Sequence, residues 1–178
     1  MTRGETNTRL WVGLLTAASA ATTLALACAT PFAALAAVAA TRMSARSGAT
    51  LMVLTWGVSQ GIGFGILGYP TDPTTLAWGV AMLTAALASI AGARWGDGST
   101  MAHGAAVRLA TAYGTGFVAF KAALLGWSFV LGGVHVAASP YWTAIQFGRE
   151  AAILVGLVAI YHALVAVGVP AADRARAV

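Results

Sequence analysis

Residues Leu10 to Ala40 read LWVGLLTAASAATTLALACATPFAALAAVAA, a run of 31 residues without a charged side chain. A membrane-spanning helix needs about 20 apolar residues, so the run is long for one span and short for two. Pro31 lies inside it, and an interior proline kinks or ends a helix. Two interpretations follow. The run is either one kinked helix, or a tight hairpin of a span from Leu10 to Ala29 and a short helix from Pro31 to Ala40.

The rest of the chain is equally apolar. Of 178 residues, 59% are hydrophobic and only 8% are charged, whereas about a quarter of the residues of a soluble domain carry a charge. Four more predominantly apolar segments follow: Ala49 to Leu67, Thr75 to Ala93, Leu109 to Leu131, and Tyr141 to Val169. The sequence therefore predicts an all-α, polytopic transmembrane bundle over residues 10–169, with about six helices and a short second helix.

Arginine positions favour the hairpin. Cationic side chains collect on the cytoplasmic side of a membrane, and the single-helix interpretation would place Arg3 and Arg9 opposite Arg42 and Arg46. The hairpin places eight arginines on one side and leaves no Lys or Arg in the loops of the other: Arg3, Arg9, Arg42, Arg46, Arg94, Arg108, Arg174 and Arg176. We expect residues 1–9 and the tail 170–178 to be cytoplasmic, in a multi-pass protein of the inner (plasma) membrane.

Several classes of function are disfavoured. The net charge is +5 and the pI about 10.2, but the cations are scattered singly, so no nucleic-acid partner is expected. Cys28 is the only cysteine, which excludes a disulfide within the chain. The sequence has no phosphate-binding loop and no hydrolase motif, and its three histidines fall at three depths. We therefore expect no enzyme, no cofactor and no metal site. A cleavable signal peptide ending near Ala29 is an alternative for the first segment.

Glycines recur every four residues in the third segment, at Gly57, Gly61 and Gly65. Small residues at this spacing form one stripe on a helix and let a neighbouring backbone approach closely in lipid. We expect the stripe to pack inside the bundle, and a homodimer face is the alternative.

Three charged residues lie inside apolar segments, where a charge is costly: Lys121, Arg149 and Glu150. At about 1.5 Å per residue, Lys121 and Glu150 lie roughly level in depth. One hypothesis is a cavity open to the outside, and the alternative is a structural Lys121–Glu150 ion pair. The predicted ligand-binding residues of the cavity are Trp56, Gln60, Lys121, Trp142, Gln146, Arg149 and Glu150, four of which share one face of the last segment.

A six-helix bundle of this size, with both ends inside and a polar pocket toward the outside, resembles the substrate-binding S-components of energy-coupling factor vitamin transporters. In that family an alanine-rich first helix with the pattern A-x-x-x-A faces a coupling subunit, and Ala17 and Ala21 match this spacing. The resemblance implies energising transporter subunits as partners. It also implies a ligand site toward the outside, where Gln146, Arg149 and Glu150 would contribute.

The sequence thus predicts a membrane subunit that lies in a lipid bilayer and binds and helps to import a small solute, such as a vitamin or another micronutrient. The alternative is a structural or assembly subunit of a larger membrane complex, without transport activity of its own.

Overall fold

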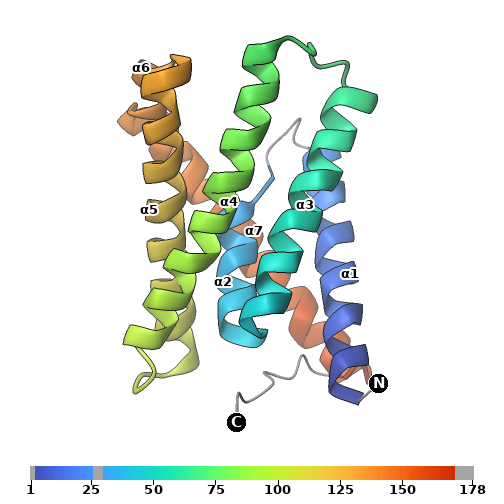
Figure 1. Cartoon of the computed structure of the whole chain (residues 1–178). Helices are drawn as coiled ribbons and strands as arrows, with labels where there is room; N and C mark the ends of the chain where they lie inside the picture. The colour runs from blue at the N-terminus through green and yellow to red at the C-terminus, as the bar shows by residue number, and fades with distance from the viewer. Residues whose placement is uncertain (1–2, 26–29, 171–178) are drawn as a thin grey trace.

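The structure, a computed structural model, describes residues 3–25 and 30–170, and in these ranges it is helical with no strand (Figure 1). Its helices are α1 (Arg3–Ala25), α2 (Phe32–Arg42), α3 (Ala45–Gly65), α4 (Pro73–Ser99), α5 (Ala105–Leu131), α6 (Val134–Ala137) and α7 (Pro140–Ala166). The predicted all-α class is confirmed. The four-residue α6 was not predicted. Residues 26–29, where the signal-peptide alternative places its cleavage, and the tail from 171 onward lie outside the described residues.

Three of the described helices, α4, α5 and α7, are long and apolar enough to cross a membrane. Large apolar side chains also cover outward faces of the bundle, as at Val80, Val118, Phe129 and Val155. Such surfaces are stable in lipid rather than in water. The structure therefore supports a membrane protein whose apolar helices contact the bilayer.

The short helix α2 lies at the centre of the bundle. It begins near mid-height and runs back toward the end at which α1 starts (Figure 1). It contacts α3, α4, α5 and α7, and every residue from Phe32 to Ala40 is buried. The run Leu10 to Ala40 therefore contains two helices, as the hairpin interpretation requires. An isolated eleven-residue helix is marginal, and the alanines of α2 let its neighbours approach and stabilise it by packing.

Glycines bring α4 and α5 together. A Cβ added at Gly92 would stand 2.7 Å from the Thr115 carbonyl oxygen, and one at Gly116 would stand 3.1 Å from the Ser89 carbonyl oxygen. Near the turn between the two helices, Arg108 Nη2 forms an ion pair with Asp97 at 2.7 Å. These close contacts make α4 and α5 an antiparallel pair that supports one side of α2.

The glycine stripe of α3 does not pack inside the bundle. Gly57, Gly61 and Gly65 are exposed, and nothing lies within 4 Å of a Cβ added at any of them. The prediction of internal packing is therefore wrong. The face of α3 that is buried carries larger residues, among them Leu51, Met52 and Thr55. Spacing alone predicts that the glycines share a face, but it does not say which face turns inward.

Aromatic and cationic side chains close the end where α1 begins. The indole of Trp11 donates to the Pro170 carbonyl at 2.8 Å, and its ring lies 4.6 Å from that of Tyr161 on α7. The guanidinium of Arg42, at the end of α2, stacks 4.2 Å from the same tyrosine ring. The positive charge of Arg42 also interacts favourably with the negative, carbonyl end of the α2 dipole. Helices α1, α2 and α7 are thereby joined at one end of the bundle.

Candidate functional site

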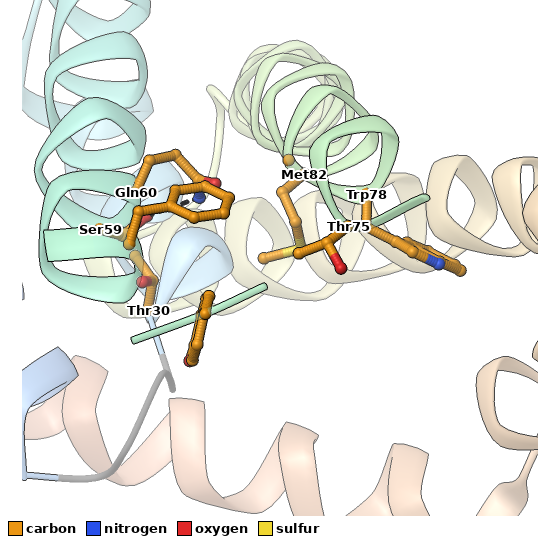
Figure 2. A pocket seen from close by; sticks show the side chains of 9 residues that line it. Thr30, Ser59, Gln60, Thr75, Trp78 and Met82 are labelled. Atoms are coloured by element: carbon orange, nitrogen blue, oxygen red, sulfur yellow. Dashed lines mark hydrogen bonds between the residues drawn. The ribbon is translucent and has the colours of Figure 1, made fainter. Parts of the chain in front are cut away.

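A partly open cavity of about 160 Å³ lies between α3 and α4, at the start of α2 (Figure 2). Among the side chains that line it, none is charged. Aromatic rings and a thioether make up the apolar part of the wall, and hydroxyls and one amide make up the polar part. The lining residues are Thr30, Ser59, Gln60, Phe64, Tyr69, Thr75, Trp78, Gly79 and Met82.

Hydrogen bonds fix the α3 side of this cavity. The Ser59 hydroxyl donates to the Trp56 carbonyl at 2.7 Å, and Gln60 Nε2 donates to that hydroxyl at 3.3 Å. The indole of Trp56 donates to the Gly79 carbonyl at 2.8 Å and so ties α3 to α4. Of the two predicted site residues on α3, Gln60 therefore lines the cavity, and Trp56 supports its wall from behind.

Tyr69 lines the cavity from the turn after α3, where glycines make room for its ring. The chain turns after α3 at Gly68, whose φ of +68° suits glycine. The Tyr69 amide then donates to the Gly63 carbonyl at 3.1 Å, and a Cβ at Gly63 would stand 2.7 Å from the tyrosine ring. The phenol ring thus packs directly on the α3 backbone, which explains why Gly63 carries no side chain.

Asp72 organises the α4 side. Its carboxylate accepts from the Thr74 and Thr75 amides at 2.9 and 3.1 Å and caps α4. The Thr75 hydroxyl donates to the same carboxylate at 2.6 Å, and this bond is the main cause of the lowered pKa of Asp72. Because the Thr75 proton is engaged, that hydroxyl faces the cavity as a hydrogen-bond acceptor.

Glu150 caps the buried start of α2. Its side chain is only 2% exposed, Oε2 accepts from the Ala33 amide at 2.9 Å, and the Ala34 amide also interacts with the carboxylate. The Phe32 amide also has a partner, since it donates to the Thr30 carbonyl, and the Leu35 amide makes the first regular helical bond, to the Pro31 carbonyl. Because the N-cap Pro31 has no N–H, this helix start leaves three open N–H groups, and those of Phe32, Ala33 and Ala34 all have partners inside the bundle.

Gln146 holds this carboxylate in place. Its Nε2 donates to Glu150 Oε1 at 3.0 Å from one turn earlier on α7. On α5, the Tyr113 hydroxyl donates to the Phe147 carbonyl, which anchors α7 beside the same site. Helix starts favour negative charge, so a carboxylate bound to α2 joins α7 to the centre of the bundle.

Lys121 and Glu150 do not form the predicted ion pair at contact distance. Lys121 is half-buried and its charge interacts with that of Glu150, as expected for residues at similar depth. Within the described part of the chain, however, no ion pair joins Lys121 to Glu150. The Glu150 oxygens instead accept from the α2 amides and from Gln146. The sequence did not predict this, because residue spacing on α5 and α7 gave no sign that a third helix starts between them.

The remaining predicted residues of α7 point outward. Arg149 is exposed, and Trp142 is 55% exposed with its ring 5.1 Å from that of Tyr141. The structure therefore joins Gln146 with Glu150 and leaves Lys121 nearby, but it does not gather these residues around the cavity that Gln60 lines. A ligand-binding role for the α7 residues stays a prediction.

Most of the cavity wall was missed from the sequence. Trp78, Met82 and Thr75 lie one turn apart on α4, and this mixed polar and aromatic face so near a predicted loop was a usable signal. Thr30 gave no signal, because its place depends on where α2 starts.

No protein-family model, curated protein or solved structure matches this chain.

Proposed function

We propose that this chain is a membrane subunit that binds a small, uncharged, planar solute in the cavity between α3 and α4 and helps to import it. The observation that carries the proposal is the cavity wall. It combines the rings of Phe64, Tyr69 and Trp78 with the amide of Gln60 and has no charged lining residue. Binding sites for small molecules are typically apolar with a few placed polar groups.

The size and chemistry of the wall restrict the solute. A cavity of about 150 Å³ accommodates a benzene-sized molecule, and this one has about 160 Å³. Aromatic faces favour stacking, and Gln60 offers both a donor and an acceptor. The best fit is a single heteroaromatic ring with hydrogen-bonding substituents, such as the ring of a vitamin or of its precursor.

A role in import draws support from the place of the cavity. Its lining residues Tyr69 and Thr75 flank the turn from α3 to α4, which lies at the opposite end of the bundle from the turn between α4 and α5 (Figure 1). Arg108 lies near that second turn, at the start of α5. If cations face the cytoplasm, the cavity faces outward, as a solute arriving from outside requires. The topology-level resemblance to vitamin-transporter S-components agrees with this direction and with a separate energising partner.

Substituting Gly79 by Ala should weaken binding without unfolding the protein. The added Cβ would stand 2.9 Å from Gln60 Oε1, so the flexible amide must leave its place in the wall. Loss of one hydrogen bond weakens affinity by about tenfold. Isothermal titration of the purified protein with nicotinamide and pyridoxine measures this change.

Gly61→Ala is the matched control, because nothing lies within 4 Å of its added Cβ. We expect its affinity for either compound to equal that of the wild type. Equal weakening by the two variants, or no binding of either compound to the wild type, would contradict the proposal.

The topology proposal has six membrane-crossing or membrane-inserted helices, α1–α5 and α7, with both ends in the cytoplasm. In a Cys28→Ala background, cysteines at the exposed Thr71 and Ala138 should react with an impermeant maleimide in intact cells. A cysteine at exposed Met101, on the opposite turn, should react only after lysis. Labelling of Met101 in intact cells would overturn this orientation.

A structural or assembly subunit is the second candidate, and Glu150 favours it. Its carboxylate is enclosed by α2 and Gln146 rather than offered to a solute. A membrane subunit without its own transport activity needs such internal bonds and an outward face for its neighbours.

A further inference from the structure

Arg149 places a positive charge on an outward face of α7. It follows Pro140, the first residue of the helix, by nine residues, which is about 14 Å along the axis. Its side chain is exposed, and it makes no hydrogen bond or ion pair with any residue that the structure describes. A lone guanidinium at this depth is costly in a bilayer.

The surrounding charges do not balance it. Lys121 and Arg149 are cations, and Glu150 is the only acid near them among the described residues. The Glu150 oxygens are already used by α2 and Gln146. With Lys121 and Arg149 both protonated, this layer of the bundle has a net positive charge whether or not Glu150 is ionised, which calls for an anionic group from outside the chain.

The helix face beside Arg149 is open to a second backbone. Ala144, Gly148 and Ala152 lie four residues apart and are exposed, and Gly156 continues the row. Nothing lies within 4 Å of a Cβ added at Gly148 or Gly156. A helix can approach such a face closely, whereas a phosphate from a lipid headgroup would leave it unfilled.

No acidic side chain that the structure describes lets a second copy of the chain supply the acid. Among the described side chains, Asp97 is buried in its ion pair, Glu150 is buried, and Asp72 lies at the bundle end where it caps α4. We propose that the Arg149 face of α7 binds a transmembrane helix of a different protein, which carries a carboxylate at the depth of Arg149.

A photo-reactive benzoylphenylalanine at Ala152, beside Arg149, tests this proposal in native membranes. The cross-linked partner is identified by mass spectrometry, and its contacting segment should be a membrane-spanning helix with an Asp or Glu. Arg149→Glu should lower the cross-link yield by on the order of tenfold, as expected for turning one interhelical polar contact in lipid into repulsion. Exchanging that partner acid for Arg should restore the yield with Arg149→Glu.

The same photo-reactive residue at Val118, exposed on α5, is the control and should not capture that partner. Because Arg149 is exposed, Arg149→Glu should keep the melting temperature of the wild type, which separates lost docking from misfolding. Cross-links only to lipid, only to a second copy, or to a helix without an acid would each overturn the proposal. So would failure of the charge exchange to restore the yield, or no cross-link at all.

Discussion

Replacing Glu150 by Ala should destabilise the protein by about 3–5 kcal/mol, the largest effect of any single substitution considered. Two α2 amides, at Ala33 and Ala34, and the Gln146 amide would lose their acceptor inside the bundle. Each buried donor without a partner costs about 1–3 kcal/mol. The residues from Phe32 to Leu35 are fully buried, so protein encloses the amides that would lose the carboxylate.

Reversible unfolding in mixed detergent micelles, followed by circular dichroism, measures this loss. Arg149→Ala is the matched control, since it removes the neighbouring charge from an exposed position and should change stability by less than about 0.5 kcal/mol. Glu150→Gln should fall between the two, because its amide keeps only one acceptor oxygen. Equal stability of Glu150→Ala and Arg149→Ala would show that the cap does not hold α2.

Glu150→Ala should also change the shape of the cavity. Thr30, whose carbonyl accepts from Phe32, lines the cavity two residues before the α2 start, and Ala33 is bound by Glu150. Only a short stretch of backbone therefore separates the carboxylate from the proposed solute site. A helix start that shifts when its cap is lost changes the position of Thr30.

The sequence predicted where the helices lie along the chain better than which helices contact one another. Helix length and position follow from uncharged runs and from prolines such as Pro73 and Pro140, which begin α4 and α7. The central place of α2 did not follow in the same way. Its shortness was visible, but its contacts depend on the residues that precede it and on four other helices.

The candidate site was predicted only in part for the same reason. Gln60 and Glu150 stood out because polar groups are rare in apolar segments, and the structure gives each of them a specific place. A charged residue in an apolar helix needs a partner. The sequence cannot tell whether the partner of Glu150 is a side chain such as that of Lys121 or a backbone amide such as that of Ala33. Backbone donors at helix starts carry no residue signature.

Gly92→Ala should destabilise the α4–α5 pair by about 1–3 kcal/mol, the cost of overpacking a close contact. The added Cβ would stand 2.7 Å from both the Thr115 carbonyl oxygen and the Ala119 Cβ. The carbonyl belongs to the helix backbone and cannot rotate away, so the two helices must separate. The packing of α2 against both helices would then loosen as well.

Gly114→Ala on α5 supplies a control with the opposite sign. Nothing lies within 4 Å of its added Cβ, and alanine is favoured over glycine in a helix by about 0.8–1.0 kcal/mol. Detergent unfolding should therefore show Gly114→Ala at least as stable as the wild type and Gly92→Ala clearly less stable. If both substitutions stabilise the protein, α4 and α5 do not approach at Gly92, and the close pairing that supports α2 is not present in the membrane.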